Sequence, residues 1–132
     1  VKLMKWLPKE EYDRMIAACD VGLIFLDHRF SIPNFPSRLL AYMQAGLPVL
    51  ACTDPNTDIG KIIVGGGFGW WCESDDVSAF INTLQTALAS DIKEKGKIAM
   101  NYLNNYSVDM CYEIILCAIG EKNLNETASI WN

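Results

Sequence analysis

The sequence predicts an α/β fold, in which a parallel β-sheet carries helices on both of its faces. Short apolar runs such as Val21–Leu26 show no alternation with polar residues, which is typical of strands covered on both sides. Segments of helical periodicity separate these runs along the chain. Strands that alternate with helices in this way favour a parallel sheet.

The first predicted elements are a strand at Val1–Leu7 and a helix at Pro8–Cys19. Apolar residues of this helix recur at positions i, i+3, i+4 and i+7, namely Tyr12, Met15, Ile16 and Cys19. Asp20 ends the helix and the strand at Val21–Leu26 follows. Asp27–Phe35 is predicted to be an irregular loop.

The segment Asn34–Leu50 carries the clearest local signals. Pro36 suits the first turn of a helix of about ten residues, because that turn needs no N–H from it. Ser37 supplies a hydroxyl and Arg38 a cation beside the unpaired amides expected in this turn, a combination that favours phosphate binding. The alternative is a proline-capped helix whose Arg38 is simply solvated.

Glycines are predicted to end two helices. Gly46 closes the helix that follows Pro36 and precedes a strand at Pro48–Cys52. Gly65–Gly69 ends a short helix at Thr57–Val64, which is capped by its first two residues, and leads into a strand at Gly69–Cys72. The glycine run does not match a phosphate-binding Gly-x-Gly-x-x-Gly loop, because it ends a helix instead of opening one.

Three further helices are predicted. Ser74 caps the first of them, with Asp75 and Asp76 in its first turn. Its predicted buried stripe is Val77, Phe80, Ile81, Leu84 and Leu88. The others span Ile92–Leu103 and the segment from Ser107 to Gly120.

The composition is that of one folded domain. Hydrophobic residues make up 51% of the 132 residues, and the net charge of −5 with no basic cluster argues against a nucleic-acid partner. Apolar runs are too short to span a bilayer. The five cysteines form no Cys-x-x-Cys pair and are predicted to be buried free thiols in a reducing compartment.

Several segments together resemble the retaining glycosyltransferases of GT-B fold, in particular the large family 4 group. The run from Pro36-Ser37-Arg38 to Tyr42-Met43 and Gly46-Leu47-Pro48-Val49 resembles the donor-binding segment of that family. Trp6-Leu7-Pro8, Cys19–Ile24 and Asn105-Tyr106-Ser107 resemble three of its other motifs, in the same order.

The resemblance implies that residues 1–120 are the C-terminal part of a Rossmann-like donor domain without its first strands, and that 121–132 form a polar tail. It implies a glycosyltransferase of polysaccharide biosynthesis that moves a sugar from a nucleotide-diphosphate donor to a glycan or lipid-linked acceptor. The absent N-terminal domain of the same chain would hold the acceptor site, so the isolated fragment is expected to be inactive. The expected location is cytoplasmic, with membrane contact through the missing domain. No transmembrane segment, metal or cofactor beyond the nucleotide-sugar is expected.

By the same resemblance, Phe35, Pro36, Ser37 and Arg38 would bind the donor phosphates and sugar, while the catalytic residues stay unassigned. Trp6 and Leu7 would line a base pocket, or Trp6 would belong to the core. His28 and Arg29 follow the carboxyl end of a predicted strand and would face the donor, or His28 would be solvated.

One departure from the family pattern concerns the donor ribose. The family carries two acidic residues eight positions apart, and the second of these binds the ribose. The corresponding residues are Pro33 and Ala41, neither of which can accept a hydrogen bond through its side chain. This favours a first alternative to a transferase, a non-catalytic nucleotide-sugar-binding or partner domain. A second alternative, within enzymes, is a GT-B-like sugar-nucleotide epimerase.

Overall fold

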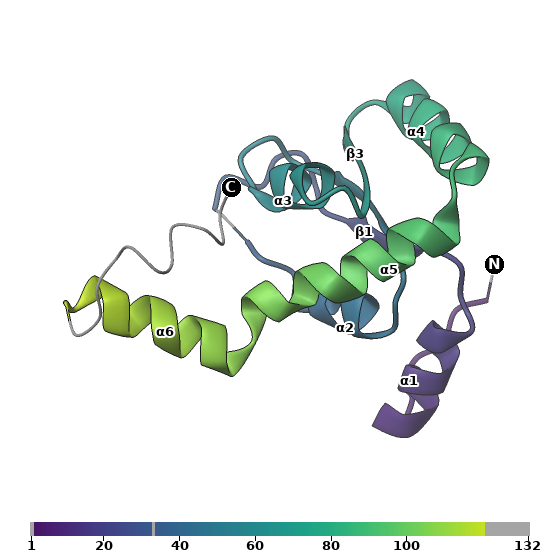
Figure 1. The fold of residues 1–132 in the computed structure, drawn as a ribbon. Helices are drawn as coiled ribbons and strands as arrows, with labels where there is room; N and C mark the ends of the chain where they lie inside the picture. The colour runs from purple at the N-terminus through teal and green to yellow at the C-terminus, as the bar shows by residue number, and fades with distance from the viewer. Residues whose placement is uncertain (1, 33, 121–132) are drawn as a thin grey trace.

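The computed structural model describes residues 2–32 and 34–120 and contains one parallel sheet (Figure 1). Its strands are β1 (Gly22–Phe25), β2 (Val49–Thr53) and β3 (Gly69–Glu73), in the spatial order β1-β2-β3. Gly22 is in register with Val49, and Val49 with Gly69. The predicted α/β class and the strand positions in the middle of the chain are therefore confirmed.

Helices cover both faces of this sheet. The helices α2 (Arg38–Gln44), α3 (Ile59–Gly65) and α5 (Ile92–Tyr102) pack on one face, where Ile24, Val49, Ala51 and Phe68 belong to the main core. The helix α4 (Val77–Ala89) packs on the other face through Phe80, Leu84 and Ala87, against Leu50 and Trp70. Every residue of β2 is buried, because β2 is the central strand.

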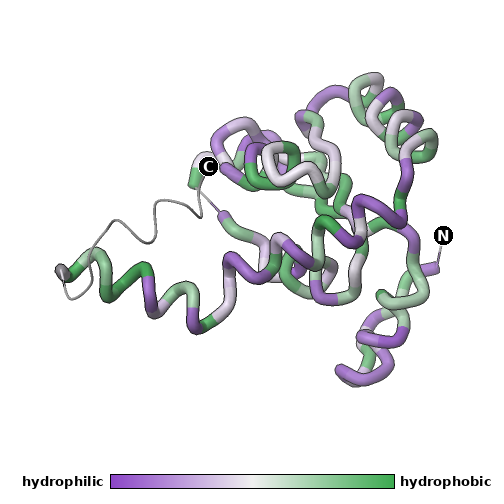
Figure 2. The backbone as a smooth tube through the Cα atoms, in the orientation of Figure 1, coloured by the Kyte–Doolittle hydropathy of each residue, from purple (hydrophilic) through white to green (hydrophobic). Residues whose placement is uncertain are grey.

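The remaining helices lie at the margins of this core. The helix α1 (Lys9–Ala17) buries only Ile16, and the 3-10 helix η1 (Leu103–Tyr106) continues α5. The helix α6 (Val108–Ala118) extends away from the sheet (Figure 1). Figure 2 shows hydrophobic residues along α6 even though it projects from the body of the domain.

Both predicted glycine stops are confirmed. Gly46 has a φ of 68°, and the Leu47 N–H donates to the Tyr42 carbonyl over 2.9 Å, which closes the end of α2. Gly67 has a φ of 72° after α3, and its N–H donates to the Val64 carbonyl. A positive φ is easily adopted only without a Cβ, so these positions need glycine.

The predicted strand at Val1–Leu7 is wrong for the residues that the structure describes. Residues 2–7 form no strand, and Leu3 and Trp6 are 88% and 79% exposed. Within the described part of the chain no other strand pairs with this segment, and a strand is stable only when its backbone groups find such a partner.

Two helix starts also differ from the prediction. Asp76, not Ser74, caps α4, since its carboxylate accepts the Ala79 N–H over 2.9 Å. At α3, neither Thr57 nor Asp58 caps through its side chain. The Asp54 carboxylate instead accepts hydrogen bonds in the preceding turn.

The predicted burial of two segments is only half right. In α4, Val77, Ile81 and Leu88 are exposed, and in β1 the side chains alternate between buried and exposed. The reason is common to both segments: α4 packs mainly on β2 and β3 and covers β1 only in part, through the contact of the Phe80 and Phe25 rings at 5.4 Å between centroids.

The predicted burial of the cysteines holds for Cys52, Cys72 and Cys117. It is wrong for Cys19, which follows α1, and for Cys111 of α6; both are exposed because these helices lie at the margin of the core. Burial, and then the neighbouring Cys72 thiol, raise the pKa of Cys52 to about 12, so this sulfur stays protonated and behaves as a core group.

The predicted polar tail, residues 121–132, lies outside the residues that the structure describes.

Candidate functional site

The carboxyl ends of the strands carry the candidate site, where ligands bind in open parallel sheets. A cavity of about 360 Å³ lies between the end of β1 and the start of α2. Its lining consists of residues 24–26 and 34–38, which include the predicted donor-binding residues Phe35, Pro36, Ser37 and Arg38. We call it the Arg38 cavity, because Arg38 is the one charged residue among the described residues that line it.

A ring contact, a helix start and a neighbouring tyrosine fix how these side chains lie. The Phe35 ring packs against Tyr106 of η1, with 5.9 Å between ring centroids. Arg38 is the first residue of α2 and is exposed. The Arg38 side chain lies near Tyr42, whose pKa is raised by burial and lowered in part by the Arg38 charge.

The turn before α2 differs from the prediction. The helix has seven residues instead of about ten, and the Ser37 side chain caps no amide. The N–H groups of Leu39 and Leu40 donate to the carbonyls of Pro36 and Ser37 over 3.0 and 3.2 Å. The turn therefore uses these two amides itself, and the side-chain groups that can recognise a phosphate here are the hydroxyl of Ser37 and the guanidinium of Arg38.

The predicted donor-loop residues His28 and Arg29 do not line the Arg38 cavity. The Arg29 guanidinium binds both carboxylate oxygens of Asp27, at 2.9 and 2.6 Å, and His28 Nδ1 lies 3.7 Å from Asp27 Oδ1. The hydrogen bonds from Arg29 hold the pKa of Asp27 well below its usual range. To meet a phosphate, Arg29 would have to leave this paired arrangement.

The predicted base-pocket residues lie elsewhere. Trp6 is largely exposed and Leu7 half-buried in the irregular segment before α1, and neither lines the Arg38 cavity. Ala41, the position of the missing ribose-binding carboxylate, lines a separate hollow of about 280 Å³ between α1 and α2. Pro33 lies outside the described residues.

The loop after β2 is organised by Asp54, which is fully buried. Its carboxylate accepts hydrogen bonds from the N–H of Asn56 and from the N–H and hydroxyl of Thr57, at 2.8–2.9 Å. Burial alone would raise the pKa of Asp54, but the bonds from Thr57 and Asn56 together lower it. Sequence reasoning did not single out Asp54; its place directly after a buried strand was the signal that could have found it.

Thr53 connects this loop to the sheet. The Thr53 hydroxyl accepts the indole N–H of Trp71 over 2.9 Å and donates to the Asp54 carbonyl over 3.1 Å. On the outer side of the loop, the Asn56 side-chain amide donates to the Phe30 carbonyl over 3.1 Å. A chain of hydrogen bonds therefore runs from β3 through the loop after β2 to the loop after β1.

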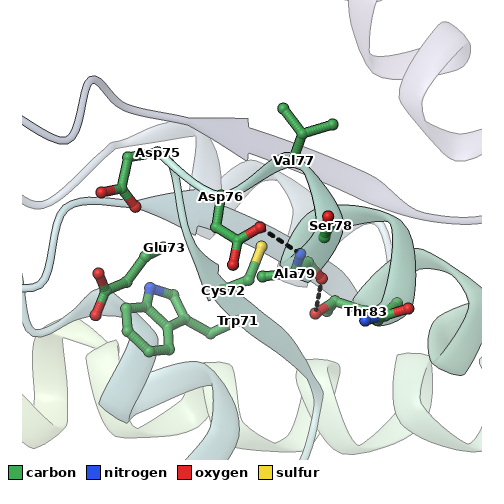
Figure 3. Close-up of a pocket in the computed structure, with 10 residues that line it drawn as sticks. Trp71, Cys72, Glu73, Asp75, Asp76, Val77, Ser78, Ala79 and Thr83 are labelled. Carbon is green, nitrogen blue, oxygen red and sulfur yellow. Dashed lines mark hydrogen bonds between the residues drawn. The ribbon is translucent and has the colours of Figure 1, made fainter.

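A second, larger cavity of about 670 Å³ lies at the carboxyl end of β3 (Figure 3). The carboxylates of Glu73, Asp75 and Asp76 surround it, together with the Trp71 indole and the Cys72 thiol. Sequence reasoning missed this cavity because it assigned the acidic run only to a helix start. Its lining is acidic, so it repels a phosphate, whereas the Arg38 cavity attracts one.

Within residues 2–32 and 34–120, no three His, Cys, Asp or Glu side chains gather closely enough to hold a metal ion. In the same ranges, no helix has the length and apolar character needed to cross a membrane.

The fold and the Arg38 cavity define the class: an α/β domain with a Rossmann-like parallel sheet and a candidate anion site at its carboxyl edge. The sequence is related to a glycosyltransferase. It is 31% identical over 102 residues to the probable glycosyltransferase WbjE of Pseudomonas aeruginosa. The match covers 76% of this chain, which spans about a quarter (26%) of that relative's length. No protein-family model and no solved structure matches the chain.

Proposed function

We propose that this chain is the C-terminal donor-binding part of a retaining GT-B glycosyltransferase of family 4 type, from a polysaccharide pathway of the cytoplasm. The parent polypeptide would move a sugar from a nucleotide-diphosphate donor to a glycan or lipid-linked acceptor. The observation that carries the proposal is the Arg38 cavity, at the carboxyl end of β1 in a chain related to a glycosyltransferase.

The chemistry of the cavity supports a diphosphate ligand. The guanidinium of Arg38 is a planar fork that matches two phosphate oxygens, and the Ser37 hydroxyl lies beside it in the sequence. Among the described lining residues there is no carboxylate to compete for Arg38. Ile24, Phe25, Leu26 and Phe35 add apolar groups to the wall, and Asn34 adds a side-chain amide that can also hydrogen-bond a phosphate oxygen.

In the proposed reaction, Arg38 stabilises the negative charge that develops on the departing nucleoside diphosphate. Ser37 donates a hydrogen bond to the same group, and Phe35 forms one wall of the sugar-phosphate pocket. The groups that bind the acceptor would come from the part of the parent outside this chain. That part would also make any contact with a membrane.

A second candidate function is a non-catalytic nucleotide-sugar-binding domain. The observation that favours it is Ala41, whose side chain cannot accept a hydrogen bond from a ribose hydroxyl and faces the hollow between α1 and α2. In that case the Arg38 cavity would still bind the diphosphate, but no sugar would be transferred.

The experiment that separates these functions uses the parent polypeptide and UDP-, GDP- and dTDP-sugars. We expect one donor to bind with micromolar affinity and its sugar to be transferred to an acceptor glycan, while the isolated 132-residue chain transfers none. Binding without transfer or hydrolysis would favour the non-catalytic domain. Transfer by the isolated chain would contradict the division of the site between two domains.

A further inference from the structure

We propose that Asn56 is a positioning residue for the donor site: its side-chain amide fixes the loop after β1, and with it the wall of the Arg38 cavity. This inference rests on the proposed function. Asn56 does not line the Arg38 cavity, so it would act through the loop and not by touching the donor.

The loop after β1 has few other connections to the rest of the domain. Its internal bonds are local, such as the Phe30 N–H donating to the Asp27 carbonyl over 3.0 Å. Of the hydrogen bonds made by residues 27–32 and 34–36, the Asn56–Phe30 bond is the one that reaches a distant part of the described chain. The ring contact of Phe35 with Tyr106 then holds the other end of the loop.

Asn56 is well placed to hold the loop because its own backbone is fixed. The Asn56 N–H donates to the buried Asp54 carboxylate over 2.9 Å, and Thr57 donates to the same carboxylate twice. The Thr53–Trp71 bond ties this turn to β3. The side-chain amide of Asn56 therefore extends from a well-bonded turn to a loop whose other hydrogen bonds are local.

If Asn56 only stabilised the fold, its substitution would lower the stability of the whole domain. Asn56 is exposed, and exposed side chains that make one hydrogen bond contribute little to global stability. Its loss should therefore loosen the loop after β1 and weaken donor binding, while the fold keeps its stability.

The test is Asn56→Asp in the parent polypeptide, because aspartate has the same size but turns an acceptor oxygen toward the Phe30 carbonyl. The matched control is Asn101→Asp, which makes the same chemical change at an exposed position of α5. Hydrogen exchange is measured on peptides covering residues 26–36 and 59–73, and uridine, guanosine and thymidine diphosphates are titrated by calorimetry.

We expect Asn56→Asp to speed exchange in residues 26–36 only, and to weaken binding of the preferred diphosphate about threefold to tenfold, with the control unchanged. Unchanged exchange in residues 26–36 would overturn the proposal, and so would faster exchange with unchanged affinity. Faster exchange in both peptides would also overturn it, because that result indicates a folding role. If the unsubstituted parent binds no diphosphate, the proposed function and the positioning role both fail, while the exchange data still show whether Asn56 holds the loop.

Discussion

Isoleucine side chains are buried between α3 and the sheet but exposed on the projecting helix α6. Ile63 of α3 is completely buried against the sheet, whereas Ile115 of α6 is 58% exposed. Both helices contain isoleucines, at positions 59, 62 and 63 in α3 and 114 and 115 in α6. The difference teaches that an apolar pattern reveals a helix but not the surface that covers it.

The largest loss of stability is expected for a substitution at the buried Ile63 of α3. Ile63→Ala should lower the free energy of unfolding by about 2–5 kcal/mol, because it leaves a cavity in a closely packed interior. The same substitution at Ile115 should change it by less than about 0.5 kcal/mol. Urea denaturation followed by circular dichroism measures both. Equal losses would show that α6 is covered in solution.

Two helical glycines, Gly96 in a crowded place and Gly65 in an open one, extend the comparison to backbone packing. A Cβ on Gly96 would collide with the Gly46 carbonyl oxygen, where α5 crosses the end of α2, so Gly96→Ala should destabilise the domain by about 1–3 kcal/mol. Gly65 has no neighbour within 4 Å of such a Cβ, and Gly65→Ala should stabilise by about 0.4–1 kcal/mol. Thermal melts of the two variants test the sign. A stable Gly96→Ala variant would mean that α5 does not pack so closely.

The buried carboxylate of Asp54 gives a smaller, pH-dependent effect. Its pKa is lower in the folded than in the unfolded chain, so its charged form adds stability that is fully present above about pH 4 and is lost as the pH falls further. In Asp54→Asn this acid-side loss should shrink. Unfolding free energies measured between pH 2 and 7 would show a shallower slope for the variant. An unchanged slope would indicate that the bonds from Thr57 and Asn56 do not favour the charged form.

Much of the fold could be predicted from the sequence, because local rules decide it. Gly46 stops α2 through a backbone conformation that glycine favours, and the uninterrupted apolar run at Val49–Cys52 identifies a buried strand. The exposure of Leu88 and Phe25 could not be predicted, since it depends on which elements lie opposite them. The capping of α4 by Asp76 depended on which of several adjacent polar residues adopts an extended backbone.

The candidate site was predictable in part for a similar reason. Phe35–Arg38 lie together in the sequence, and a strand–loop–helix unit brings them to the sheet edge by itself. The pairing of Arg29 with Asp27 and the bond from Asn56 to Phe30 depend on loop geometry, which the sequence pattern does not specify. The pairing of Arg29 with Asp27 decides which cation remains available to a phosphate.

The central claim is that Arg38 binds the donor diphosphate, and calorimetric titration of the parent polypeptide with its preferred nucleotide-sugar tests it directly. Arg38→Ala should weaken binding about tenfold or more, because a charged hydrogen bond contributes about 1.5–3 kcal/mol. The affinity of Arg38→Lys should lie between those of the unsubstituted parent and Arg38→Ala, because lysine keeps the charge but lacks the planar fork. Arg14→Ala, a change at an exposed arginine of α1, should leave the affinity unaltered. Tight binding that survives Arg38→Ala would contradict the account and place the diphosphate elsewhere.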